Sequence, residues 1–123
     1  MAGKKVLVVD DSLSAVLWQK LVLRQERYEV LTATDGEAAV AAAAAERPDL
    51  ILMDVVMPGI DGFEASRQIH ATPATRHVPI VMTTTREKLA QLRQSAAGDA
   101  ARFLMKPIDR DALLAAVGGY LGR

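Results

Sequence analysis

Short apolar runs alternate five times with longer segments of helical periodicity along this chain. Each run is too short for a buried helix, and its continuous apolar character suits a strand that is covered on both faces. Strands that alternate with helices form βαβ units, so we expect one parallel sheet with helices on both faces. The runs cover residues 6–9, 28–33, 50–53, 80–83 and 103–105.

The segments between the runs carry the signals of helices. Ser12 or Ser14 is placed to cap the first helix and Asp35 the second, because a short polar side chain satisfies the free amides of a first turn. The second helix contains an alanine run, and alanine is the strongest helix former. The predicted helices run from the serine cap to about residue 26, then over 36–46, 62–70, 85–97 and 109–120.

The number of units indicates the fold class. Five of them are typical of an α/β protein with a doubly wound, five-stranded parallel sheet in the strand order 2-1-3-4-5. The run at 28–33 is more polar than the others, as expected of an edge strand. The sequence shows no repeat, linker or second domain, so we expect a single domain over residues 1–123.

Composition narrows the classes of function. Basic and acidic residues number 15 each, and the formal charge of zero argues against a nucleic-acid or membrane-surface binder. The absence of cysteine excludes disulfides and thiolate metal sites. No apolar run approaches the roughly 20 residues of a membrane span. The opening MAGKK leads into too few apolar residues for a signal peptide, so we expect a cytoplasmic protein.

Three carboxylates follow predicted strands that should be neighbours. Asp10 and Asp11 come directly after the first strand, and Asp54 comes directly after the third. Two carboxylates about 4 Å apart repel each other by roughly 4 kcal/mol at an effective dielectric near 20, so the cluster needs a cation. Oxygen ligands of this kind select Mg²⁺ or Ca²⁺, and a Mg²⁺ site beside a free carboxylate suits phosphoryl transfer. Lys106, after the fifth strand, offers a second positive charge at the same edge.

Each of these residues also has a simpler interpretation. Asp11 or Ser12 serves equally well as a helix cap, and Asp54 as a turn residue. Lys106 taken alone is a solvated surface lysine, and Phe103 taken alone is a core residue. The joint placement at the carboxyl ends of four predicted strands favours a functional site.

Four motifs, in order, resemble those of the CheY-like response-regulator receiver domains, a family with the flavodoxin-like fold. The segment VLVVDDS resembles the family's acidic pair, and LILMDVVMPGIDGFE resembles its phosphoacceptor strand and turn. The segments PIVMTT and FLMKP resemble the ends of the fourth and fifth strands. The resemblance covers residues 3–121, practically the whole chain.

The resemblance implies a role for each acidic residue. Asp54 is the implied phosphoacceptor. Asp10 and Asp11, together with Asp54 and the backbone carbonyl of Val56, are the implied ligands of Mg²⁺.

The same resemblance implies a switch. Thr84, rather than Thr83, supplies the hydroxyl that bonds the phosphoryl group, and Lys106 contacts a phosphoryl oxygen. Phe103 is the switch aromatic that packs inward when Thr84 moves. Pro107 follows Lys106 through a cis peptide bond.

The implied function is that of a signalling switch rather than a metabolic enzyme. A sensor histidine kinase or a histidine phosphotransfer protein donates the phosphoryl group, and the domain catalyses its own phosphorylation and dephosphorylation. Output comes from binding a protein whose identity is unknown, by a monomer or weak dimer. Val56 and Arg86 depart from the polar and acidic residues common at these family positions, which bears on the lifetime of the phosphorylated form.

Other classes of function remain for comparison. A phosphorylation-independent protein-binding module on the same fold is the main alternative, and the intact acidic set argues against it. A flavin-binding protein needs a phosphate loop where this chain has DDSLS. A phosphatase of the haloacid dehalogenase type needs a second aspartate at Val56. His70 and His77 have no evident partner.

The first helix has more apolar positions than one core face needs. Ala15, Trp18, Val22 and Leu23 are expected on one side, and residues 16, 17 and 21 form a second stripe. Since the family uses this helix to dock phosphotransfer helices, Leu17 and Leu21 are expected to be partly exposed.

Overall fold

The computed structural model describes residues 3–85, 87–88 and 102–122. Its elements alternate as the sequence predicts, and the fourth helix, expected at 85–97, lies almost wholly outside the described residues. The strands are β1 Lys5–Val9, β2 Glu29–Ala33, β3 Leu50–Asp54, β4 Ile80–Thr84 and β5 Arg102–Met105. The helices are α1 Leu13–Gln25, α2 Gly36–Glu46, α3 Gly62–Ala71, the short 3₁₀ helix η1 Pro73–Thr75 and α5 Arg110–Leu121.

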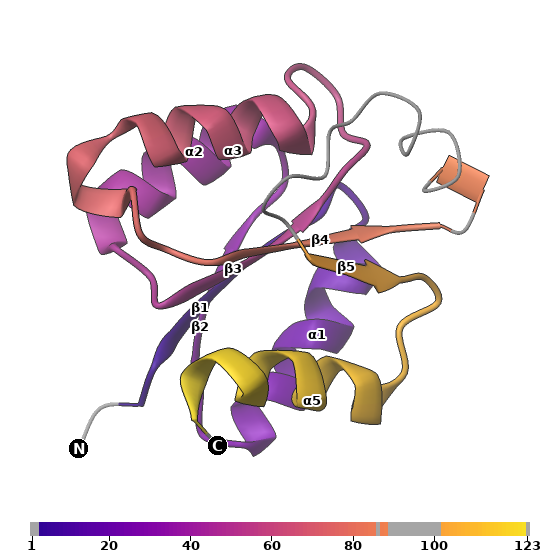
Figure 1. The fold of residues 1–123 in the computed structure, drawn as a ribbon. Coiled ribbons are helices and arrows are strands. Elements are labelled where there is room, and N and C mark those ends of the chain that lie inside the picture. The colour runs from indigo at the N-terminus through magenta and orange to yellow at the C-terminus, as the bar shows by residue number, and fades with distance from the viewer. Residues whose placement is uncertain (1–2, 86, 89–101, 123) are drawn as a thin grey trace.

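The five strands form one parallel sheet in the predicted order β2-β1-β3-β4-β5. Helices α2 and α3 cover one face, and α1 and α5 cover the other (Figure 1). Strands β1, β3 and β4 are almost free of solvent contact, as their unbroken apolar runs predict. The more polar β2 is an edge strand, which confirms that expectation.

Polar side chains cap the N-termini of helices α1, α2, α3 and α5. Ser12 accepts a hydrogen bond from the amide of Ala15, which confirms Ser12 as the cap of α1. Asp35 caps α2, as predicted, and Asp109 caps α5. Such caps satisfy backbone amides that have no partner within the helix, and so they fix where each helix starts.

The buried face of α1 differs from the predicted one. Val16, expected in the outer stripe, is buried, whereas Trp18, expected in the core, is 38% exposed. Gln19 occupies a buried position that the apolar pattern gave no reason to choose. Leu17 and Leu21 are 50% and 63% exposed, as predicted. Apolar residues surround most of this helix, so periodicity alone cannot select the face that packs on the sheet.

The register of the sheet places the acidic residues side by side. Val9 at the end of β1 pairs with Met53 in β3, so Asp10 and Asp54 follow on neighbouring strands. Among the described helices, none combines the length and apolar character needed to cross a bilayer.

Candidate functional site

Asp10 is held in a fixed orientation beneath the surface. It is 1% exposed, and its backbone amide donates to the carbonyl of Ala33. The Oδ1 atom accepts a hydrogen bond of 2.9 Å from the amide of Ser12, which is also the cap of α1. The Oδ2 atom is buried and receives no hydrogen bond from the described residues. One carboxylate oxygen of Asp10 is therefore anchored, while the other is left to interact with a cation.

Lys106 supplies one such cation to two carboxylates. Its Nζ atom lies 3.2 Å from Asp10 Oδ2 and 3.2 Å from Asp54 Oδ2. The backbone positions the lysine, because its amide donates a 2.7 Å hydrogen bond to the carbonyl of Thr84. Strands β1, β3 and β5 thus bring together residues that are far apart in the sequence.

The pKa values of Asp54 and Lys106 are both raised, which shows that the single lysine does not fully compensate the negative charge of the buried carboxylates. Burial raises the pKa of Asp54, and the nearby charge of Asp10 raises it further. Lys106 and a backbone hydrogen bond from Val56 act in the opposite direction without cancelling the rise. Burial alone would lower the pKa of Lys106, but the charges of Asp54 and Asp10 outweigh burial and raise it. The lysine therefore stays charged while the carboxylates are still short of positive charge.

The acidic cluster fits a divalent cation. One carboxylate oxygen from each of Asp10, Asp11 and Asp54 lies within 4.8 Å of the others. Asp11 is exposed and leaves the site open to solvent, while the other two are buried. The Oδ2 atom of Asp10, which has Lys106 as its sole polar partner among the described residues, is the kind of hard oxygen ligand that Mg²⁺ prefers. These three side chains would hold Mg²⁺, which supplies charge neutralisation for phosphoryl transfer when bound.

The loop after β3 is packed tightly against the end of that strand. The amide of Gly62 donates a 2.9 Å hydrogen bond to the carbonyl of Val55. A Cβ atom at Gly62 would lie 2.4 Å from the carbonyl oxygen of Asp54, so only glycine permits this approach. Val56 lies in the same loop, is 53% exposed, and forms a backbone hydrogen bond with Asp54. The IDGF segment marks a turn in the sequence, but the close approach of Gly62 to the backbone of β3 is visible only in the structure.

The other predicted residues lie at the ends of β4 and β5. Thr84 is buried at the end of β4, and its neighbour Thr83 pairs with Asp54 in the sheet register. The bond between Lys106 and Pro107 is cis, which confirms the prediction. Arg86 lies outside the described residues.

Phe103 is half-buried in β5, and its ring meets Phe63 of α3. The centroids of the two rings are 6.3 Å apart, with the rings edge to face. Phe63 could not be identified from the sequence, because no local pattern links residue 63 to residue 103.

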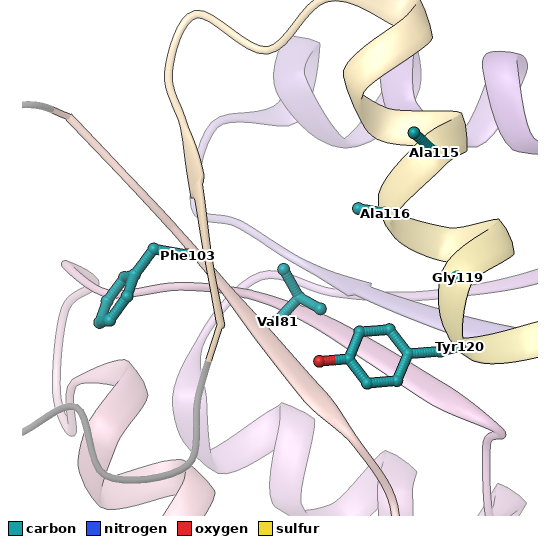
Figure 2. A pocket seen from close by; sticks show the side chains of 6 residues that line it. All are labelled: Val81, Phe103, Ala115, Ala116, Gly119 and Tyr120. Carbon is teal, nitrogen blue, oxygen red and sulfur yellow. The ribbon is translucent and has the colours of Figure 1, made fainter.

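A hollow of about 260 Å³ lies between the last two strands and α5 (Figure 2). The ring of Phe103 points away from Tyr120, toward the other side of β5. None of the described residues that line the hollow carries a carboxylate, amine or imidazole, so this part of the lining lacks the chemistry of the acidic cluster. The residues that line it are Val81, Phe103, Ala115, Ala116, Gly119 and Tyr120.

Exposed apolar side chains gather on α1, immediately after the acidic pair. We name the set formed by Leu13, Leu17, Trp18 and Leu21 the α1 patch. Leu13 is 65% exposed and Leu21 is 63% exposed, which is unusual for large apolar residues close together on one helix. A surface of this kind beside a reactive site favours a protein partner.

Comparison with known proteins agrees with this geometry. The model of the response regulator receiver domain family matches residues 6–118. The response regulator PleD of Caulobacter vibrioides is 44% identical over 113 residues, which are 92% of this chain but 25% of PleD. The chain thus spans about a quarter of the length of that relative. The protein PilH of Pseudomonas aeruginosa is 34% identical, and the match covers 95% of this chain and 97% of PilH.

Solved structures show the same fold. The receiver domain of the sensor histidine kinase PA1611 from Pseudomonas aeruginosa, with a magnesium ion in its active-site cleft, is 31% identical with a TM-score of 0.88. That match covers 99% of this chain and 100% of the other. The chemotaxis response regulator CheY4 of Vibrio cholerae is 36% identical with a TM-score of 0.86, over 97% and 99% of the two chains.

Proposed function

This chain belongs to the response regulator receiver domain family, and we propose that Asp54 is the residue that accepts its phosphoryl group. The family function is Mg²⁺-dependent phosphorylation in two-component signalling, with a histidine kinase as donor, and the acidic pocket of Asp10, Asp11 and Asp54 fits it. The observation that carries the assignment is Lys106, whose Nζ atom lies 3.2 Å from Asp54 and 3.2 Å from Asp10. Of the three acidic residues, Asp54 is the one that both contacts Lys106 and ends the central strand β3.

The transfer is a direct displacement at phosphorus. An oxygen of Asp54 attacks the phosphorus of a phosphohistidine, a P–O bond forms and the P–N bond breaks, and the imidazole leaves with its electron pair and takes up a proton. Lys106 neutralises the charge that develops on the phosphoryl oxygens. Asp10, Asp11 and Asp54, together with the backbone carbonyl of Val56, would hold the divalent cation, which would supply further neutralisation of that charge.

The phosphorylated state is read out through Thr84 and Phe103. The Thr84 hydroxyl bonds the phosphoryl group, and Phe103 moves inward as Thr84 is drawn toward Asp54. This biases a two-state surface that binds a downstream protein. Residues 1–123 form a single domain in this proposal. The domain is monomeric or weakly dimeric. Its cytoplasmic location stays a prediction.

A small phosphodonor with intact mass measurement tests the acceptor. One phosphoryl group should be added in the presence of Mg²⁺ and none after chelation, and Asp54→Asn should abolish the addition. Asp61→Asn is a control, because Asp61 caps α3 without belonging to the acidic cluster. Labelling that persists in Asp54→Asn would move the acceptor elsewhere, and a protein that is never labelled would favour a phosphorylation-independent binding module.

The phosphodonor protein docks on the α1 patch. Leu17 and Leu21 are exposed in the first helix after Asp10 and Asp11, where a helical bundle that carries a phosphohistidine can pack beside the acids. Leu17→Ser with Leu21→Ser should therefore slow phosphotransfer from the cognate kinase and leave labelling by the small donor unchanged. Trp18 is the only tryptophan, so its fluorescence reports docking directly. Equal transfer from the kinase to the parent and the double variant would exclude this docking site.

A further inference from the structure

We propose that Phe63 is a positioning residue that couples the backbone of the phosphoacceptor loop to the ring of Phe103. The inference rests on the proposed function, in which phosphorylation of Asp54 changes the position of Phe103. It adds a second route to that switch, through α3, beside the route through Thr84.

The first link of this route is the contact between the two rings. Phe63 and Phe103 are half-buried and pack against the same hydrophobic cluster on the α2 and α3 face of the sheet. Their centroids are 6.3 Å apart and their planes meet at 66°, which is the preferred edge-to-face arrangement of aromatic pairs. Phe103 points away from α5 and its neighbour Tyr120, so its ring is on the same side as α3 (Figure 2).

The second link joins Phe63 to the phosphoacceptor. Phe63 follows Gly62, whose amide donates a 2.9 Å hydrogen bond to the carbonyl of Val55. A Cβ atom added at Gly62 would lie 2.4 Å from the carbonyl oxygen of Asp54 and 3.1 Å from the Cα atom of Val55. The first turn of α3 therefore rests directly on the backbone of residues 54 and 55. A displacement of that backbone must move the start of α3, and with it the ring of Phe63.

The chemistry of Phe103 makes its packing partner decisive. A phenylalanine ring has no hydroxyl that a hydrogen bond could hold, so packing alone sets its orientation. The strength typical of an edge-to-face pair changes the ratio of two ring positions by about two- to twelvefold. Among the described residues, Phe63 is the aromatic residue whose ring contacts that of Phe103. Removal of the Phe63 ring should therefore alter how the Phe103 ring responds to phosphorylation.

Fluorine NMR can isolate this coupling because the chain has only two phenylalanines. The full chain is produced with para-fluorophenylalanine, which gives one resonance for each ring. In Phe63→Leu and Phe63→Tyr only the resonance of Phe103 remains, and Tyr restores a ring at position 63. Spectra are recorded with Mg²⁺, before and during incubation with excess small phosphodonor, and intact mass gives the phosphorylated fraction. Phe63→Met replaces Phe63→Leu if the leucine variant does not fold.

We expect both resonances of the parent to shift on phosphorylation. In Phe63→Leu the phosphorylation-induced shift of Phe103 should shrink at least twofold at equal phosphorylated fraction, and Phe63→Tyr should restore it. The same shift of Phe103 in the leucine, tyrosine and parent proteins would overturn the inference, since Phe63 would then only fill space. A parent that is not phosphorylated would instead overturn the proposed function.

Discussion

Neutralising Asp54, the proposed phosphoacceptor, should stabilise the metal-free protein. In Asp54→Asn the buried side chain keeps its shape but loses its charge. Burial and the neighbouring Asp10 both disfavour that charge, and Lys106 offsets them only in part, which is why the pKa of Asp54 is raised. The expected result is a higher melting temperature for Asp54→Asn than for the parent.

The distances set the scale of this effect. Carboxylate oxygens of Asp10 and Asp54 within 4.8 Å of each other repel by about 3.5 kcal/mol at an effective dielectric near 20. The ammonium of Lys106, 3.2 Å from Asp54, attracts it by about 5 kcal/mol on the same scale. These two interactions together favour the charge by about 1.5 kcal/mol. The raised pKa of Asp54 shows that desolvation, its largest cause, exceeds this attraction, so we expect neutralisation to stabilise the fold by about 1–2 kcal/mol. For a domain of this size that corresponds to about 4–10 °C in melting temperature.

Thermal unfolding in chelator at several pH values measures the gain. Because the pKa of Asp54 is raised in the folded state, its charge destabilises the fold above that folded pKa. Below the unfolded value, near 3.8, the side chain is neutral in both states. The advantage of Asp54→Asn should therefore be present at neutral pH and disappear as the pH falls toward that value. Saturating Mg²⁺ should favour the parent, which keeps all three carboxylates.

Asp11→Asn is the matched control, because Asp11 belongs to the same cluster but is exposed to solvent. Screening should leave this variant close to the parent in chelator. An Asp54→Asn protein that melts at or below the parent temperature at neutral pH would refute the electrostatic reasoning. So would an equal gain from Asp11→Asn, because burial would then not be the cause.

Three further predictions follow from other contacts. Lys106→Met should raise the affinity for Mg²⁺ severalfold, measured by titration, since the ammonium of Lys106 competes for the same carboxylate oxygens. The same variant should be phosphorylated by a small donor at least tenfold more slowly, and an unchanged rate would show that the lysine does not act in the transfer step. Val56→Asn should speed loss of the phosphoryl group severalfold, because the exposed apolar side chain cannot hold the attacking water, whereas Val56→Ala should not. Gly62→Ala should destabilise the fold by about 2 kcal/mol or more in denaturant unfolding, because its Cβ would overlap the carbonyl of Asp54. Gly119→Ala, with open space around it in α5, should instead stabilise by up to about 1 kcal/mol; equal effects of the two substitutions would contradict the packing argument.

The strands, caps and acidic cluster could be predicted because local rules determine them. Unbroken apolar runs identify buried strands, and the parallel arrangement then brings the carboxyl ends of β1, β3 and β5 to one edge. This is how Asp10 and Lys106, 96 positions apart (106 minus 10), could be placed together before any contact was known.

The buried face of α1 and the ring pair could not be predicted in the same way. Apolar residues occupy both sides of α1, so the choice between Val16 and Trp18 depends on how the helix rests on the sheet. The contact between Phe63 and Phe103 joins α3 to an edge strand, and no sequence period relates the two. Tertiary packing decides such details, and local patterns carry no information about them.

The same electrostatic imbalance that weakens the metal-free fold is what makes the site responsive. A single ammonium serves two buried carboxylates, and the Oδ2 atom of Asp10 depends on that ammonium alone among the described residues. A fully satisfied network would hold one arrangement firmly and would gain little from a new ligand. We expect a divalent cation to reduce this repulsion, and a phosphoryl group on Asp54, as proposed, to compete with Asp10 for Lys106. Because the backbone amide of Lys106 is bonded to the carbonyl of Thr84, we expect that exchange of partners to act on the ends of β4 and β5.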